Sequence, residues 1–113
     1  ERVSAELATH ALVFQFTPIG RDGRRLPHRV VGIHPVRNLN ADLLHELFWE
    51  TVFLLKARSR LSVVMGVCDG GSANRLLIKM NTSGSGRGTA NTFVQAWCWN
   101  SVEPWRRLFF ATD

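Results

Sequence analysis

Cysteine is scarce in this sequence, with two residues among 113. Cys68 follows Val67, and Cys98 stands between two tryptophans, which is the apolar company typical of buried free thiols in a reducing compartment. The sequence therefore favours two free thiols over a structural disulfide and argues against a secreted chain.

Long apolar runs are absent as well. No segment approaches the roughly 20 apolar residues that a helix needs to cross a bilayer, so no membrane partner is expected, and no charged-then-apolar leader precedes the first strand-like run. With 45% hydrophobic residues and a net charge of +5, the chain is too apolar and too weakly charged for a disordered tail. Its length has room for one modest core and not for two domains. We therefore predict a single soluble α/β or α+β domain, or part of one, over residues 1–113.

Lysine is almost missing from the basic residues, because the 14 Lys and Arg residues include only Lys56 and Lys79 as lysines. The planar arginine fork matches phosphate oxygens, so the composition admits a nucleic-acid partner, although a charge of +5 does not require one.

The histidines have neither mutual ligand spacing nor cysteines at zinc-site spacing, so no metal site built on nitrogen or sulfur is expected. They are His10, His28, His34 and His45.

Two strand-like segments joined by a polar turn predict a β-hairpin near the amino terminus. Residues 9–17 are rich in β-branched and aromatic side chains, and residues 21–25 form a turn with an Asp-Gly pair. The second strand is expected over Arg29–Val36, where Pro35 restricts it to a sheet edge or a strand end. For the arginines at the tip, a solvated loop is favoured over contacts with DNA phosphates. These arginines are Arg21, Arg24, Arg25 and Arg29.

Residues 41–58 show the pattern of an amphipathic α-helix. Asn40 is a suitable cap, Asp42 complements the positive end of the helix dipole, and Lys56 complements the negative end. The apolar stripe is broad, which suits a helix packed against a sheet. We interpret His45 and Trp49 as packing residues rather than as ligands. The stripe consists of Leu43, Leu44, Leu47, Phe48, Val52, Phe53, Leu54 and Leu55.

The almost unbroken apolar run over residues 61–68 predicts a strand buried on both faces of a mixed or parallel sheet. An acid and two glycines follow at residues 69–71, and a helix is expected over residues 73–80. A last strand is expected over residues 108–112. The order of strand, acid, glycines and helix is the informative feature of this region.

Residues 81–105 are expected to form a flexible loop or an insertion, because residues 81–91 are rich in Ser, Gly, Thr and Asn. The glycine-rich stretch 84–89 is not predicted to bind phosphate, since it follows a helix instead of a strand and lacks the Gly-Lys-Ser/Thr ending. Asn81 begins a glycosylation sequon that we attribute to chance frequency.

Asp69 is the one residue whose position suggests chemistry. Ligands bind at the carboxyl ends of strands in open α/β sheets, and a carboxylate held there can bind Mg²⁺, which prefers oxygen ligands. A two-metal site needs several acidic groups, and one carboxylate does not supply them. The residues alone also allow Asp69 to be no more than the cap of the following helix, and they leave the two interpretations open.

Residues 64–75, with the segment Cys-Asp-Gly-Gly-Ser-Ala-Asn-Arg at their centre, resemble the second-aspartate segment of P-element-type transposases, the group that includes the THAP-domain transposases of animals. Residues 7–14 are similar to an upstream strand of that family, and the Arg29–Val36 strand and a helix follow in the family's order. Residues 108–113 are similar to the strand that leads into an Asp-Pro-Pro-His-Leu segment. The resemblance covers most of residues 5–80 and 106–113.

The resemblance implies an α/β fold of the RNase H-like type, with hairpin strands, a helix, a central strand ending in Asp, a helix and a further strand in a mixed sheet. It also implies a nuclear DNA transposase of the cut-and-paste kind that acts on transposon ends with Mg²⁺ or Mn²⁺. Carried over by residue, Asp69 is a catalytic carboxylate and metal ligand. Gly70 and Asn74 shape the turn and hold the helix start, and Asp113 is structural or accessory.

The resemblance further implies that these residues form only part of an RNase H-like domain. The first catalytic Asp is expected upstream of Glu1 and the remaining acids beyond Asp113, and both ends have the character of cuts in a longer chain. The expected partners are the rest of that domain, its insertion domain, and other copies through an unpaired sheet edge. The 113 residues alone are expected to be catalytically inert.

Two alternatives to the catalytic interpretation stay open. In one, the chain is a domesticated, non-catalytic module that binds DNA or protein through the arginine-rich hairpin and the tryptophan-rich segment. In the other, it is an α/β domain without a site, and Asp69 only caps a helix.

Overall fold

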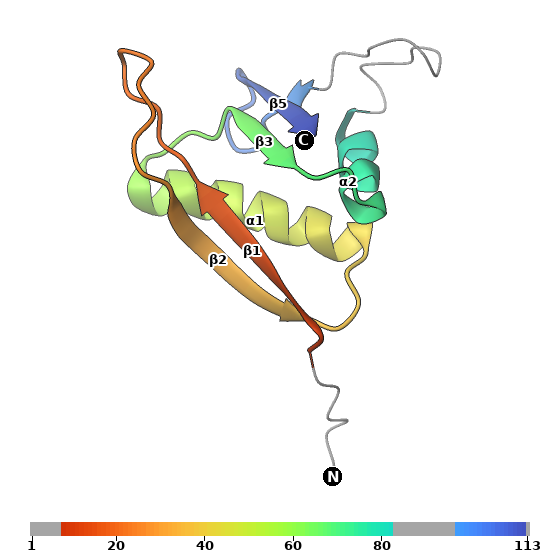
Figure 1. Cartoon of the computed structure of the whole chain (residues 1–113). Coiled ribbons are helices and arrows are strands. Elements are labelled where there is room, and N and C mark those ends of the chain that lie inside the picture. Colours follow the sequence, from red (N-terminus) through yellow and green to blue (C-terminus); the bar gives the residue numbers. More distant parts are fainter. Residues whose placement is uncertain (1–7, 83–96, 113) are drawn as a thin grey trace. The chain divides into compact units, whose positions relative to one another are not determined.

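The computed structural model describes residues 8–82 and 97–112 (Figure 1). They form a mixed α/β structure with two helices and two sheets. The chain divides into two compact units, one up to Leu39 and one from Asn40 onward; we call them the hairpin unit and the sheet unit. Across the described ranges, neither helix is long and apolar enough to span a membrane.

The hairpin unit consists of strands β1 (His10–Phe16) and β2 (Arg29–Val36), which pair antiparallel. The turn between them closes with hydrogen bonds from the amide of Gly23 to the carbonyl of Gly20 and from the amide of Gly20 to the carbonyl of Arg24, both 2.9 Å. Gly23 has a φ of 81°, a conformation that glycine adopts without the steric cost of a side chain. The predicted hairpin and its Asp-Gly turn are therefore confirmed.

The helix α1 (Ala41–Ser59) opens the sheet unit, and its start is the one predicted. The side chain of Asn40 accepts a hydrogen bond of 2.8 Å from the amide of Leu43, which satisfies one of the free donors in the first turn. Leu44 and Val52 are buried, whereas Phe53 is 54% exposed. The apolar stripe on the core side is thus narrower than the sequence suggested.

A three-stranded sheet follows, in the order β3-β5-β4. The middle strand β5 (Arg107–Thr112) runs parallel to β3 (Met65–Cys68) and antiparallel to β4 (Trp97–Trp99). The helix α2 (Ser72–Thr82) lies between β3 and β4 in the chain. The order of strand, acid, glycines and helix is present as predicted, and β5 confirms the last strand.

The core of the sheet unit lies between one face of this sheet and α1. Leu108 and Phe110 of β5 are 0% and 7% exposed, and the ring of Phe110 lies 5.6 Å from the ring of Phe48 on α1. A side-chain carbon at Gly66 would come within 3.3 Å of the Phe110 ring. Glycine at this position therefore allows the aromatic pair to pack closely over β3.

Two predictions about this sheet are wrong. The strand over residues 61–68 shortens to β3, and it lies at the edge of its sheet while β5 takes the centre. It is also not buried on both faces, since Met65 and Val67 are 52% and 63% exposed. The flexible loop expected over residues 81–105 is contradicted at both of its described ends, because residues 81–82 belong to α2 and residues 97–105 contain strand β4 and a hydrogen-bonded turn up to β5. Its part over residues 83–96 lies outside the described residues, and the alternative of an insertion stays a prediction.

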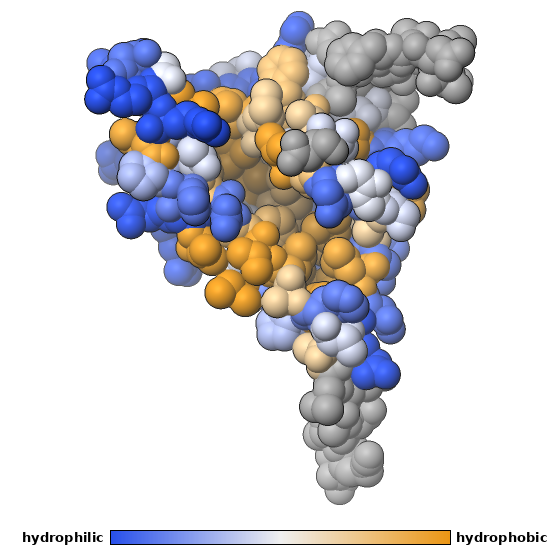
Figure 2. Space-filling view, in the orientation of Figure 1, coloured by the Kyte–Doolittle hydropathy of each residue, from blue (hydrophilic) through white to orange (hydrophobic). Residues whose placement is uncertain are grey.

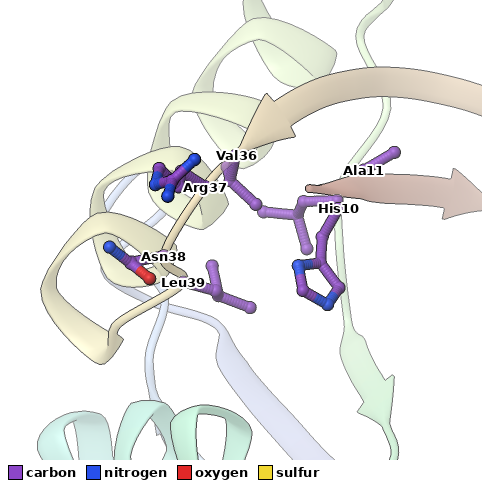
Figure 3. Close-up of a pocket in the computed structure, with 7 residues that line it drawn as sticks. His10, Ala11, Val36, Arg37, Asn38 and Leu39 are labelled. Carbon is purple, nitrogen blue, oxygen red and sulfur yellow. The ribbon is translucent and has the colours of Figure 1, made fainter. Parts of the chain in front are cut away.

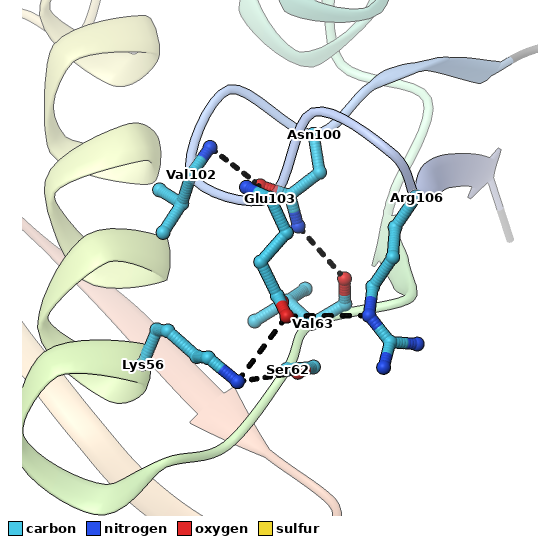
Figure 4. Close-up of polar contacts among 7 residues, drawn as sticks. All are labelled: Lys56, Ser62, Val63, Asn100, Val102, Glu103 and Arg106. Atoms are coloured by element: carbon cyan, nitrogen blue, oxygen red, sulfur yellow. Dashed lines mark hydrogen bonds and ion pairs between the residues drawn. The ribbon is translucent and has the colours of Figure 1, made fainter.

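The turn between β4 and β5 is held by a polar network that sequence analysis did not anticipate (Figure 4). Asn100 is 0% exposed and donates to the carbonyl of Val63 at 3.3 Å. Glu103 is 2% exposed and forms ion pairs of 3.2 Å with Lys56 and with Arg106. Its partners come from α1 and from the turn, so this carboxylate ties two distant segments together.

Candidate functional site

The carboxylate of Asp69 lies directly after β3 and before α2. Its Oδ1 accepts a hydrogen bond of 2.9 Å from the amide of Gly71 and one of 2.7 Å from the side-chain amide of Asn74. Within the described part of the chain, Oδ2 forms no hydrogen bond or ion pair. The side chain is exposed. One oxygen thus fixes the carboxylate, and the other is free of hydrogen bonds to the described residues.

These two hydrogen bonds, first the one from the Gly71 amide and then the one from Asn74, lower the pKa of Asp69 below its ordinary value. Both donors favour the ionised form, because they bind the negative oxygen better than a neutral one. The carboxylate is therefore fully charged at neutral pH. Such a group can bind a divalent cation without first losing a proton.

The two glycines after Asp69 have different roles. Gly70 has no positive φ, and a Cβ added to it would meet no atom within 4 Å, so the turn itself does not require glycine there. A Cβ on Gly71 would lie 3.1 Å from Asp69 Oδ1. Asn74 joins the first turn of α2 to Asp69 by its hydrogen bond, and Gly71 is the glycine that positions the carboxylate.

A complete metal site is not present in the residues that the structure describes, where no three His, Cys, Asp or Glu side chains gather around one point. Asp69 suits a single ligand position of Mg²⁺ or Mn²⁺, whose other positions water and substrate oxygens commonly fill. Thr112, the last residue of β5, pairs in register with Cys68, so β3 and β5 end at the same edge of the sheet. Asp113 follows Thr112 in the sequence and lies outside the described residues.

The predicted cationic tip of the hairpin is exposed at all four arginine positions, Arg21, Arg24, Arg25 and Arg29. Figure 2 shows the tip as a hydrophilic surface, whereas hydrophobic side chains gather over β1 and β2. Asp22 pairs with Arg24 at 3.5 Å, and both side chains are largely exposed. One carboxylate against four guanidinium groups leaves the tip with a net positive charge.

A hollow of about 460 Å³ lies at the start of β1 and the end of β2 and has little capacity for chemistry (Figure 3). It contains one imidazole, that of His10, which is hydrogen-bonded to Thr9 at 2.8 Å. Among the described residues, no carboxylate or thiol lines it. The lining residues are His10, Ala11, Leu12, Val36, Arg37, Asn38 and Leu39.

The remaining candidates serve packing. His45 and Trp49 on α1 both contact Oδ1 of Asn81 on α2, at 3.2 and 2.9 Å, and the amide nitrogen of Asn81 donates to the carbonyl of Leu77 at 2.8 Å. This nitrogen is the one that a glycan would modify, and here it is bonded within α2, while Oδ1 joins the two helices. Cys68 and Cys98 are free, and burial raises the pKa of each thiol.

Sequence reasoning found Asp69 from its place after a strand but missed Gly71, whose role depends on the direction of its amide. It also missed the pair Asn100 and Glu103, because no local pattern marks a buried acid whose partner Lys56 lies 47 residues away. Comparisons with models of protein families, with curated proteins and with solved structures found no match to this chain.

Proposed function

We propose that this chain is part of the RNase H-like catalytic domain of a nuclear, cut-and-paste DNA transposase, and that Asp69 supplies one carboxylate ligand to a divalent metal ion. The observation that carries the proposal is an ionised, exposed carboxylate with one oxygen fixed by Gly71 and Asn74, directly after a strand. The resemblance of residues 64–75 to the transposase segment supplies the reaction class.

The role of this chain in such a site is to position a charge. The amide of Gly71 and the side chain of Asn74 hold Oδ1 of Asp69, so Oδ2 would be the oxygen that binds a metal ion. A bound Mg²⁺ or Mn²⁺ would activate the attacking water and stabilise the leaving oxygen of DNA. Further carboxylates from the rest of the domain would complete the site, with DNA of the transposon ends as substrate.

Binding of Mn²⁺ tests the ligand role directly. Paramagnetic broadening of amide signals, followed as Mn²⁺ is added to the chain, is expected to be strongest at residues 69–71. Asp69→Asn should abolish this broadening, because the amide keeps an acceptor for Gly71 but loses the charge. Asp42→Asn removes another exposed acid in the first turn of a helix and serves as the control. Equal broadening in wild type and Asp69→Asn would contradict the ligand role.

The catalytic role is tested in a longer polypeptide that contains these residues and cleaves DNA. Asp69→Asn is expected to abolish metal-dependent strand cleavage and to leave DNA binding largely intact, because the ligand acts on the reacting phosphate and not on recognition. Normal cleavage by this variant would exclude Asp69 from catalysis. Gly70→Ala should leave the fold intact, since its Cβ meets open space.

A second candidate function is non-catalytic contact with DNA phosphates through the hairpin tip. The four exposed arginines with a single neighbouring acid favour it. Binding of duplex DNA should then weaken steeply with salt, and the double variant Arg21→Glu, Arg25→Glu should flatten that dependence by about two units of slope. Arg58→Glu, Arg75→Glu is the matched control in the sheet unit. An unchanged slope in the hairpin variant would exclude this candidate.

A further inference from the structure

One face of the β3-β5-β4 sheet carries aromatic, apolar and cationic side chains and is exposed. Side chains of directly paired residues lie on the same face of a sheet. The register pairs Trp97 with Phe109, Trp99 with Arg107, and Met65 with Phe109. We call this set the open face, and it consists of Met65, Val67, Trp97, Trp99, Arg107 and Phe109.

The exposure of the open face contrasts with that of the opposite face. Trp99 is 54% exposed and Phe109 is 38% exposed, whereas the neighbouring Leu108 and Phe110 of the same strand are buried, Phe110 against Phe48 of α1. Apolar and aromatic side chains that form a contiguous exposed patch are typical of a binding surface, whereas single scattered ones are not.

Arg107 gives the open face its charge. Its guanidinium group lies 4.5 Å from the centre of the Trp97 ring and 5.8 Å from that of Trp99, in cation–π geometry. Within the described residues it forms no ion pair with a carboxylate. The one acid of the adjoining turn, Glu103, is buried and engaged by Lys56 and Arg106. Among the residues that the structure describes, the face is therefore aromatic and positive, with no acid that neutralises Arg107.

This composition selects among partners. A second copy on the same face would bring a second Arg107 into the interface with no carboxylate to pair it, which is costly once water is excluded. A purely apolar protein segment would likewise bury Arg107 without a counter-charge. A single-stranded nucleic acid offers what the face lacks, because its bases stack on aromatic rings and its phosphates pair with arginine.

We propose that the open face binds single-stranded nucleic acid, with bases stacked on Trp99 and Phe109 and a phosphate paired with Arg107. Trp97 acts as a positioning residue, since its ring supports the guanidinium of Arg107. The open face contains neither Asp69 nor its hydrogen-bond partners, and binding to it needs no metal. Failure of the metal proposal would therefore leave this one untouched.

Fluorescence anisotropy of labelled oligothymidylate and oligouridylate of about 12 nucleotides, titrated with the chain in EDTA, tests the proposal. Wild type should bind at low salt. Trp99→Ala should weaken binding by roughly 5- to 150-fold, the range expected for one lost stacked base, and Trp99→Phe should retain most of the affinity. Arg107→Glu should weaken binding and lower the salt slope by about one unit.

Phe53→Ala is the matched control, because Phe53 is 54% exposed but lies on α1, and it should bind like wild type. Circular dichroism of each variant checks that it folds. If Trp99→Ala does not fold, Trp99→Phe keeps the test informative. The proposal would be overturned if wild type did not bind, or if Trp99→Ala and Arg107→Glu bound as tightly as wild type. Competition by a duplex as strong as that by a single strand of the same length would also overturn it. A dimer that Trp99→Ala dissociates would assign the face to a second copy and overturn it as well.

Discussion

Glu103 is a charged residue in a place that water hardly reaches, with cations from α1 and from its own turn as partners. Glu103→Gln keeps the shape and removes the charge, which leaves Lys56 and Arg106 without their counter-ion. We expect the free energy of unfolding to fall by about 1.5–3 kcal/mol, the range for a hydrogen bond to a charged group. Urea denaturation at neutral pH measures it. Asp22→Asn breaks an exposed pair instead and should cost less than about 0.5 kcal/mol.

The same residue predicts a pH dependence. Burial by itself raises the pKa of Glu103, but the hydrogen bonds from Ser62 and Lys56 and the charges of Lys56 and Arg106 outweigh it and lower the pKa below the ordinary value of 4.5. The stabilisation is therefore complete above pH 4.5 and is lost as pH falls through the lowered folded-state pKa. The stability curves of wild type and Glu103→Gln should converge in that acidic range. A constant gap between them would contradict the assignment.

At the residue level, Asp69 shows what a sequence can predict about a site. Its place after a strand identified it as a candidate, and the geometry is compatible with both open interpretations. Oδ1 accepts from Gly71 at the start of α2, as a capping acid would, while Oδ2 stays available to a ligand. A helix cap and a metal ligand use different oxygens of the same carboxylate, so only a variant that removes the charge separates them.

At the level of elements, the end of α1 carries an unusual residue. Arg60 caps the helix with a φ of 57°, and its amide donates to the carbonyls of Leu55 and Lys56. This left-handed conformation is costly for a residue with a side chain and is usually taken by glycine. Arg60→Gly is expected to raise the free energy of unfolding by about 0.5–1 kcal/mol.

Arg58→Gly is the matched control for this variant, because it removes the same charge from inside the last turn of the helix. It should lower the free energy of unfolding by about 1 kcal/mol, the propensity difference for glycine in a helix. Urea denaturation of both variants gives the comparison. A loss of stability in Arg60→Gly would show that the cap conformation is not strained.

Elements with local signals were predictable, and those that depend on distant partners were not. The helix α1 begins after Asn40, as its cap and apolar period indicated. The hairpin follows from two strands and an Asp-Gly turn. The prediction that β3 is buried on both faces was wrong, because an apolar run does not reveal whether a second strand or a helix covers each face. The short strand β4 was missed because its three residues contain no period, and its pairing with β5 is non-local.

At the scale of the whole molecule, different interactions stabilise the two units. The sheet unit has a core between α1 and the central strand β5, whose Leu108 is fully buried. The hairpin unit is a two-stranded sheet, and an isolated hairpin is marginally stable in water. Local stability can therefore differ between the units by several kcal/mol.

Hydrogen exchange should reveal this difference. Amides of β1 and β2 are expected to exchange faster than those of β5 by at least about tenfold, since each 1.4 kcal/mol of opening free energy is a factor of ten. Gly23→Ala imposes a φ of 81° on a residue with a side chain, at a cost of about 1–2 kcal/mol, while its Cβ meets no atom within 4 Å. This variant should accelerate exchange in β1 and β2 and leave the amides of Leu108 and Phe110 unchanged. An equal acceleration in β5 would mean that the two units open as one cooperative structure.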